Sequence, residues 1–396
     1  MRVVIVGGGQ AAVSAAATLR TEGHEGPITM LSAEPVAPYQ RPPLSKKYLL
    51  GAMSLDRLML KDPSYYGEAG IDLRLGTPAR AIDRAAQRVE IDGDALAYDA
   101  LVLATGAVPR RLPATMGGDL PGVVTIRDLA DADRLAPAVA PGRRALVVGG
   151  GYIGLEAAAV AARRGMAVTL IEMAPRLLAR VAAPETAAHF RTLHSDEGVD
   201  IREGTALAGI ERQGEALAAT LSDGTVLTVD LVIVGIGIEP AAALAEAAGL
   251  DTAGGIVVDG TCRTADPAIL AAGDNAAFPW TMPDGSTARI RLESVQNAID
   301  QGAHAARAIV GEVAPYAPVP WFWSEQYDTR LQIAGLNTGY DRVVAKPGAR
   351  PGSLLVWYFA GERFIAADAA GDPRGYMQAK RWLEAGEGPV HDPLPG

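Results

Sequence analysis

Residues 3–12 of the chain read Val-Val-Ile-Val-Gly-Gly-Gly-Gln-Ala-Ala, and residues 145–154 read Ala-Leu-Val-Val-Gly-Gly-Gly-Tyr-Ile-Gly. Both stretches pass from a short β-branched run through three glycines into an alanine-rich segment. This order predicts a buried strand, a tight turn and a helix. Each copy then reaches a second apolar run, at residues 28–31 and 167–171. The chain is therefore predicted to contain two strand–helix–strand units.

The small residues of each turn have distinct physical roles. The first glycine lets the chain turn sharply out of the strand, and the next leaves room for a pyrophosphate beside the backbone. A third small residue lets helix and strand pack closely, and the pyrophosphate would lie on free N–H groups at the helix N-terminus. These roles fall on Gly7, Gly9 and Ala12 in the first copy and on Gly149, Gly151 and Gly154 in the second.

An acidic residue is expected to close each second strand. Glu34 and Glu172 occupy that place, where a carboxylate can accept hydrogen bonds from ribose hydroxyls. One glycine-rich turn is weak evidence, because such turns are common at ordinary strand–helix junctions. Two copies, each with its strand, helix and acid, predict that two dinucleotides bind the chain.

Two further apolar runs match one another. Residues 101–106 end in Ala104-Thr105-Gly106, and residues 231–237 end in Gly237, with a proline shortly beyond each run. We interpret each run as the last strand of a dinucleotide domain, where the chain crosses to its neighbour. The second domain is therefore expected to be inserted into the first, with the proline- and glycine-rich residues 107–122 as a linker.

The last third of the chain adds two features. The apolar run at residues 269–272 ends in Gly273-Asp274, which is either a plain strand-end turn or, beside two dinucleotide units, a site where Asp274 binds ribityl oxygens of a flavin. We favour the second interpretation. Residues 319–396 hold short alternating runs that predict antiparallel strands, followed by a closing helix. The predicted fold is α/β, with two interleaved Rossmann-like domains and a C-terminal α+β domain.

Composition narrows the class of protein. With 49% hydrophobic and 21% charged residues among 396, the chain is expected to be globular. A net charge of −10 argues against general affinity for nucleic acid or anionic membranes. The longest uncharged stretch, residues 3–19, contains glycines and is too short to span a membrane. The single cysteine, Cys262, excludes an internal disulfide, and the histidines lack metal-ligand spacing. No metal site is expected, and the reducing cytoplasm is the expected compartment.

Four stretches carry a family resemblance. They are Pro-Tyr-Gln-Arg-Pro-Pro-Leu-Ser-Lys at residues 38–46, Gly-Gly-Gly-Tyr-Ile-Gly-Leu-Glu at 149–156, Glu-Ser-Val-Gln-Asn-Ala at 293–298 and Pro-Trp-Phe-Trp-Ser-Glu-Gln-Tyr at 320–327. In this order they resemble the two-dinucleotide flavoprotein disulfide reductases. Within these, the chain is most similar to the oxygenase-coupled ferredoxin reductases of the putidaredoxin reductase type.

The resemblance implies FAD on the first strand–helix–strand unit and NADH on the second. It implies an FAD-binding domain at 1–110 and 247–318, an NAD-binding domain at 111–246 and the C-terminal domain at 319–396. Ala104, Thr105, Gly106 and Glu293 are expected to lie against the flavin cofactor and Gly237 against the nucleotide.

The resemblance also assigns roles to individual side chains. Lys46 would lie beside flavin N5, paired with Glu156, which is expected in the first turn of the NAD-binding helix. Arg41 would contact the flavin pyrophosphate, and Trp323 would form a wall of the flavin site. Val295 would offer its backbone N–H to the flavin pyrimidine edge. The plain alternatives are surface charges for Lys46, Glu156 and Arg41 and a core tryptophan for Trp323.

The resemblance implies a reaction as well. Disulfide reductases need a cysteine pair after the first unit, and related NADH oxidases need one cysteine there, but residues 41–46 contain none. Electrons would therefore leave the flavin directly, one at a time, for a [2Fe–2S] ferredoxin that feeds a monooxygenase or a ring-hydroxylating dioxygenase. The alternatives are an NADH oxidase, a rubredoxin or quinone reductase, and a redox-sensing interaction protein of the apoptosis-inducing-factor type.

Overall fold

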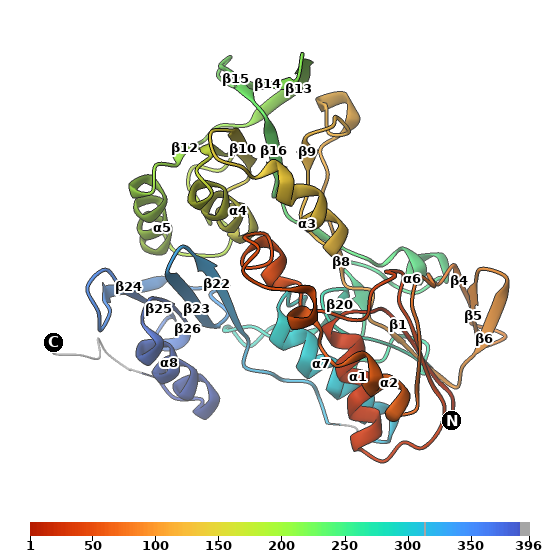
Figure 1. The fold of residues 1–396 in the computed structure, drawn as a ribbon. Coiled ribbons are helices and arrows are strands. Elements are labelled where there is room, and N and C mark those ends of the chain that lie inside the picture. Colours follow the sequence, from red (N-terminus) through yellow and green to blue (C-terminus); the bar gives the residue numbers. More distant parts are fainter. Residues whose placement is uncertain (313, 389–396) are drawn as a thin grey trace. The chain divides into compact units, whose positions relative to one another are not determined.

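The computed structural model describes residues 1–312 and 314–388, which fold into two compact units (Figure 1). The chain enters each unit several times, so neither unit is a single continuous segment. The first unit comprises Met1–Gln40, Leu55–Val108 and Glu239–Trp321, and the second comprises Arg41–Ser54, Pro109–Ile238 and Phe322–Gly396.

A five-stranded parallel sheet forms the centre of the first unit. Its central strands are buried along their whole length, as expected for a parallel sheet that is covered on both faces. In spatial order the strands are β19 (Ile269–Ala271), β7 (Ala100–Leu103), β1 (Val3–Val6), β2 (Ile28–Leu31) and β3 (Ile71–Arg74).

Two helices of this unit pack unusually closely. In α1 (Gln10–Thr21), Ser14 Oγ donates a hydrogen bond of 2.6 Å to the carbonyl of Ile299 in α7 (Val295–Ile309). A Cβ at Gly302 would lie 2.4 Å from the Ala11 carbonyl oxygen, so a side chain there would force the helices apart. The unit also contains two short helices, α2 (Pro63–Glu68) and α6 (Ala243–Ala247). It has an antiparallel sheet of β4 (Ala81–Asp83), β5 (Arg88–Ile91) and β6 (Asp94–Ala97), and a sheet of β18 (Ile256–Val257), β20 (Ala276–Thr281) and β21 (Thr287–Ile290).

The second unit repeats the parallel arrangement and adds antiparallel sheets. Its first sheet has the order β12 (Asp200–Glu203), β11 (Ala167–Glu172), β10 (Arg144–Val148), β16 (Leu231–Val234) and β9 (Val123–Val124). With it lie α3 (Leu129–Leu135), α4 (Tyr152–Arg163), α5 (Pro184–Asp196) and a sheet of β13 (Leu207–Gln213), β14 (Ala216–Leu221) and β15 (Val226–Val229). The chain crosses between the units within β8 (Ala107–Pro109) and β17 (Ile238–Pro240).

The C-terminal part of the chain forms the antiparallel strands and closing helix that its sequence predicts. The sheet has five strands, and α8 (Pro373–Ala385) packs against it. In spatial order the strands are β22 (Trp321–Gln326), β23 (Thr329–Gly335), β26 (Arg363–Ala370), β25 (Leu354–Ala360) and β24 (Arg342–Pro347).

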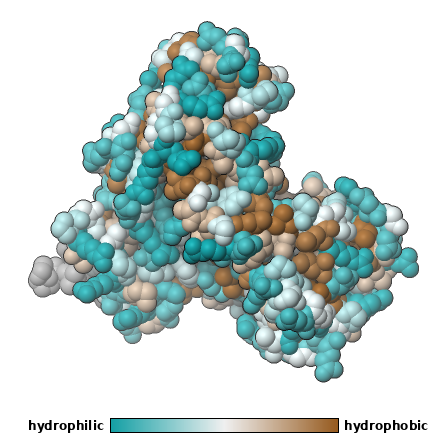
Figure 2. All heavy atoms as spheres, in the orientation of Figure 1, coloured by the Kyte–Doolittle hydropathy of each residue, from teal (hydrophilic) through white to brown (hydrophobic). Residues whose placement is uncertain are grey.

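Hydrophilic residues cover most of the visible surface, with hydrophobic patches between them (Figure 2). Few large apolar side chains of the described residues are strongly exposed. The most exposed of them is Met173, at 76%, which directly follows Glu172 at the end of β11. None of the described helices is long and apolar enough to cross a membrane.

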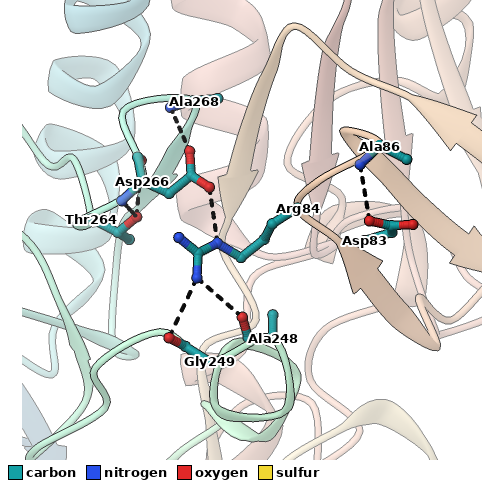
Figure 3. A network of polar contacts seen from close by, with 8 residues as sticks. All are labelled: Asp83, Arg84, Ala86, Ala248, Gly249, Thr264, Asp266 and Ala268. Carbon is teal, nitrogen blue, oxygen red and sulfur yellow. Dashed lines mark hydrogen bonds and ion pairs between the residues drawn. The ribbon is translucent and has the colours of Figure 1, made fainter.

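Arg84 holds together three segments of the first unit (Figure 3). Its Nε donates to Asp266 at 2.9 Å, and its Nη1 donates to the carbonyls of Ala248 and Gly249, at 3.3 and 3.4 Å, where α6 ends. Asp266 Oδ1 in turn accepts from the backbone N–H of Ala268 at 3.1 Å, just before β19. One guanidinium therefore links the β4–β5 hairpin to α6 and to the edge of the parallel sheet.

Replacing Arg84 with alanine should lower the free energy of unfolding by about 1–2 kcal/mol, because Asp266 loses its cation and the end of α6 loses a donor. Urea denaturation followed by circular dichroism measures the change. The matched control is Arg80→Ala on the same hairpin, whose ion pair with Asp92 is 57% and 70% exposed. That variant should be indistinguishable from the parent, since exposed pairs contribute little. Equal losses in both variants would contradict the role of Arg84.

Candidate functional site

The first glycine loop has the geometry of a pyrophosphate cradle. Gly7 has a φ of +140°, and a Cβ there would lie 2.1 Å from the carbonyl oxygen of Ala104, so only glycine fits. Gly9 is the N-cap of α1, which has no side-chain cap, and a Cβ on Gly9 would meet nothing within 4 Å. Free N–H groups at a helix N-terminus beside open space suit a diphosphate.

The second loop repeats this geometry. Gly149 has a φ of +107°, and its Cβ would lie 2.4 Å from the carbonyl oxygen of Gly235. Gly151 is the uncapped N-cap of α4 and also faces open space. A Cβ on Gly154 would lie 2.0 Å from the Gly149 carbonyl oxygen, which explains the third small residue. In the first copy Ala12, fully buried, occupies the corresponding place.

The two acids lie in different structural positions. Glu172 ends β11, as predicted, and its two carboxylate oxygens accept from the N–H groups of Gly150, at 2.6 Å, and Ala174, at 2.7 Å. The prediction that Glu34 closes its strand is wrong, because β2 ends at Leu31. Leu31 and Ile171 receive the equivalent bonds from Gly7 and Gly149. Register therefore places Ser32, two residues earlier, at the position of Glu172.

Glu34 follows in the loop, where its carboxylate accepts a hydrogen bond from the Tyr39 hydroxyl. Glu34 is the first acidic residue after β2, and the position in register with Glu172 carries an uncharged serine instead. Whether Glu34 binds ribose from this loop stays a prediction.

Three segments of the first unit converge beside Gly273. A Cβ on Gly273 would lie 3.1 Å from that of Ala11 and 3.8 Å from that of Ala298, in the first turns of α1 and α7. Asp274, the predicted ribityl ligand, follows directly. Its backbone carbonyl accepts from Arg291 at 2.9 Å, and Arg291 also pairs with Glu293 at 2.5 Å.

Polar groups beside this convergence lack protein partners among the described residues. Asn275 Nδ2 donates to Thr105 Oγ1 at 2.9 Å, but Asn275 Oδ1 and Gln301 Nε2 are buried and unpaired in the described part of the chain. Val295 is the first residue of α7, so its N–H has no partner within the helix. Buried unpaired groups are rare in proteins and mark places where a ligand or water completes the bonding. These features fit FAD.

Lys46 and Glu156 form the buried ion pair that the resemblance implies. Lys46 Nζ lies 3.0 Å from Glu156 Oε1, and the two side chains are 12% and 2% exposed. Ser45 Oγ donates to Glu156 Oε2 at 3.0 Å. The alternative that both are solvated surface charges is therefore wrong. Glu156 is the fifth residue of α4 rather than a member of its first turn, since the helix begins at Tyr152.

Strand β22 supplies further partners to this pair. Its even-numbered side chains face the helices: the Phe322 ring lies 4.8 Å from that of Tyr152, Ser324 Oγ donates to Glu156 Oε1 at 2.7 Å, and Gln326 bonds His194 in α5 at 2.8 Å. Trp323, on the alternate side of the strand, lies with its ring 5.8 Å from the Arg330 guanidinium carbon. The residue pattern alone gives no sign that Ser324, Gln326 and His194 connect to Glu156.

The remaining predicted contacts lie in both units. Arg41 precedes the short 3₁₀ turn Pro42–Ser45, and its Nη1 donates to the Arg127 carbonyl at 3.1 Å. Gly237, with a φ of +102°, accepts from the Arg110 N–H at 2.9 Å, and Gly106 has a φ of +70°. The cofactor contacts of these residues stay predictions.

The single cysteine is poorly placed for redox chemistry. Cys262 is fully buried in the core of the first unit, and burial raises the pKa of its thiol to about 12. A buried thiol that stays protonated is a poor nucleophile. With one cysteine in the chain, a dithiol cannot carry electrons away from a flavin.

Two uncapped glycine turns, each opening a helix beside a parallel sheet, define a two-dinucleotide oxidoreductase. The family model described as "Pyridine nucleotide-disulphide oxidoreductase" matches residues 1–302, and "Reductase C-terminal" matches residues 321–394. The chain belongs to the pyridine nucleotide-disulphide oxidoreductase family. Such enzymes use FAD and NAD(P)H, which confirms the predicted pair of cofactors.

Individual relatives agree over nearly the whole chain. Rhodocoxin reductase of Rhodococcus erythropolis is 42% identical over 97% of this chain and 89% of its own length. Putidaredoxin reductase CamA of Pseudomonas putida is 42% identical over 96% of this chain and 90% of its own. The crystal structure of a covalent putidaredoxin reductase–putidaredoxin complex matches with a TM-score of 0.91 and 41% identity, covering 96% of this chain and 92% of that one. The predicted fold class and the resemblance are confirmed.

Proposed function

We propose that the protein is an NADH-dependent, FAD-containing ferredoxin reductase that supplies electrons to a monooxygenase or a ring-hydroxylating dioxygenase. The observation that carries the proposal is a pair of nucleotide cradles together with the buried Lys46–Glu156 pair, in a chain whose one thiol is inert. Relatives named rhodocoxin reductase, putidaredoxin reductase and ferredoxin--NAD(P)(+) reductase support a ferredoxin as the acceptor.

The proposal assigns FAD to residues 1–110 and 247–318, NADH to 111–246 and the α+β domain to 319–396. Gly7, Gly9 and Ala12 would hold the flavin pyrophosphate, Asp274 the ribityl chain, and the Val295 N–H the pyrimidine edge. Gly149, Gly151 and Gly154 would hold NADH, with Glu172 on its adenosine ribose. Bound FAD supplies the chemistry of accepting a hydride and releasing electrons singly.

Lys46 and Glu156 are the residues we assign to hydride transfer. The carboxylate has low exposure and three donors, so it is held in one orientation and fixes the ammonium of Lys46 in turn. A fixed cation beside the reacting atoms stabilises negative charge that develops during reduction, at no cost of reorganisation. Arg41 and Trp323 are assigned to the flavin by resemblance only. The cytoplasm, where NADH is available, is the proposed compartment.

The acceptor is tested by steady-state turnover with NADH and each candidate in turn. A [2Fe–2S] ferredoxin should give the highest kcat/KM, above rubredoxin, a quinone and oxygen. Fast turnover with oxygen alone would make the protein an oxidase. Slow turnover with every acceptor, together with a long-lived charge-transfer band, would favour a redox sensor of the apoptosis-inducing-factor type.

The protein should use NADH in preference to NADPH, by on the order of 30- to 150-fold in kcat/KM. A 2′-phosphate beside Glu172 would meet a like charge and leave an acceptor without its hydroxyl donor. Arg176, the cation four residues after Glu172, already donates to the carbonyls of Leu177 and Ala179, each at 3.3 Å. Equal kcat/KM values for the two nucleotides would refute this role of Glu172.

Two substitutions test whether the charge of Glu172 sets the preference for NADH. Glu172→Ala should narrow the preference for NADH. The matched control is Glu203→Ala, one strand away in register with Glu172, whose carboxylate accepts from Leu177 at 2.9 Å and Arg191 at 2.8 Å. That variant removes an acid that supports the same loop, and it should leave the preference unchanged.

A further inference from the structure

Five side chains of the second unit form a continuous hydrogen-bonded series that ends at Glu156. Tyr327 Oη lies 3.3 Å from His194 Nδ1, and His194 Nε2 lies 2.8 Å from Gln326 Oε1. Gln326 Nε2 lies 3.2 Å from Ser324 Oγ, which lies 2.7 Å from Glu156 Oε1. Ser324, Gln326 and His194 are all fully buried, so no solvent competes for these bonds.

Which group donates and which accepts in each hydrogen bond follows from Glu156, at one end of the series. The Glu156 carboxylate, paired with Lys46, can only accept, so Ser324 must donate its single proton to it. Ser324 Oγ is then the acceptor for Gln326, which places the amide nitrogen toward Ser324 and the amide oxygen toward His194. An amide oxygen can only accept, so His194 carries its proton on Nε2.

The outer end of the series is consistent with this direction. Burial lowers the pKa of His194 to about 4, so at neutral pH the ring is uncharged and Nδ1 is an acceptor. Burial raises the pKa of the Tyr327 hydroxyl, which keeps its proton and donates it to Nδ1. All four bonds therefore point toward Glu156, and bonds aligned in one direction polarise and strengthen one another.

The series does not transport protons. The Gln326 amide has no titratable proton to pass on, so a proton that enters at His194 cannot leave at Ser324. The four bonds can, however, hold a carboxylate in place. Ser324 donates to the same oxygen that pairs with Lys46, so the series fixes the rotamer and charge distribution of Glu156.

We infer that Ser324, Gln326 and His194 are positioning residues that act through Glu156 on the Lys46–Glu156 pair; this inference rests on the proposed function of that pair. The donor series aligns the carboxylate, the carboxylate fixes the Lys46 ammonium, and the speed of flavin reduction depends on that alignment. Through these three side chains, strand β22 and helix α5 fix the orientation of Glu156.

The first arm of the test is spectroscopic and needs no turnover. In protein labelled with ¹⁵N-histidine, the ring shifts of His194 should be those of a neutral imidazole protonated at Nε2. Ser324→Ala removes the acceptor of the Gln326 amide, so a second tautomer of His194 should appear. Ser324→Thr keeps the hydroxyl and should restore the parent signals. Thr186→Val is the matched control. Thr186 is a buried residue of α5, the helix that carries His194, but its hydroxyl donates to Asp368, which lies outside the series.

The second arm is kinetic. Ser324→Ala should slow FAD reduction at saturating NADH by about 10-fold, because Glu156 loses one charge-assisted hydrogen bond. The Kd for NADH should stay within about 2-fold of the parent value. Ser324→Thr should recover most of the rate, and Thr186→Val should match the parent. Unchanged His194 signals in Ser324→Ala would overturn the directed series, and an unchanged rate would overturn its positioning role. Failure of NADH to reduce the parent protein would instead refute the proposed function, and the spectroscopic arm would still report on the series.

Discussion

Gly9→Val should weaken FAD binding by on the order of 10³-fold or more, whereas Gly151→Val should retain FAD and lose NADH binding to a similar extent. Both glycines are N-caps with extended backbones, at φ −100° and −82°, which valine adopts without strain. A Cβ at either position meets nothing within 4 Å, so the fold tolerates the larger side chain. The methyl groups of valine would occupy the space proposed for the diphosphate and separate it from the helix N–H groups.

Flavin absorbance of the purified variants and the quenching of tryptophan fluorescence by NADH measure these losses. The matched control is Gly209→Val in β13, another glycine with open space around its Cβ position and no positive φ. It should bind both cofactors as the parent does. If the Gly151 variant loses FAD and the Gly9 variant keeps it, the two cradles are assigned the wrong way round. If both variants keep FAD, the Gly9 loop does not hold the flavin diphosphate.

The cradles could be predicted from sequence because their determinants are local. Within ten residues, a strand, a glycine that must adopt positive φ, an uncapped helix start and a small packing residue follow one another. Gly7 and Gly149 have no alternative residue, since a Cβ would collide with the backbone of the neighbouring strand end. Such steric constraints appear directly in the residue pattern.

The residue that ends each strand and the contacts between distant segments could not be predicted in the same way. The assignment of Glu34 to a strand end failed because the residue in register with Glu172 is the uncharged Ser32, and the first acidic residue after β2 lies two positions later, in the loop. The series from Tyr327 to Glu156 joins β22 to α5 and α4, and its bonds to His194 and Glu156 span 132 and 168 residues of the chain. Each of its residues alone resembles an ordinary polar residue, and only the tertiary structure brings them together.

Replacing Glu156 with alanine should slow the reduction of FAD by NADH by on the order of 10²- to 10³-fold, far more than it weakens FAD retention. The substitution removes the only carboxylate that an ion pair joins to Lys46 in the described residues and leaves a cation that is 12% exposed. Without its partner the ammonium is free to change rotamer, and that change removes a preorganised charge. Stopped-flow absorbance at saturating NADH measures the rate, and bound flavin measures the retention.

A double-substitution cycle separates the pair from its members. Glu156→Gln keeps the volume and an acceptor for Ser324, so any loss it shares with Glu156→Ala is due to charge rather than to a cavity. Lys46→Met removes the cation while keeping an apolar side chain of similar length. If the two residues act as one unit, Lys46→Met combined with Glu156→Gln should be no slower than the worse single variant, because each single change already disables the pair. Additive losses would mean that the two residues act independently, and an unchanged rate in Glu156→Ala would leave the ion pair with a structural role alone.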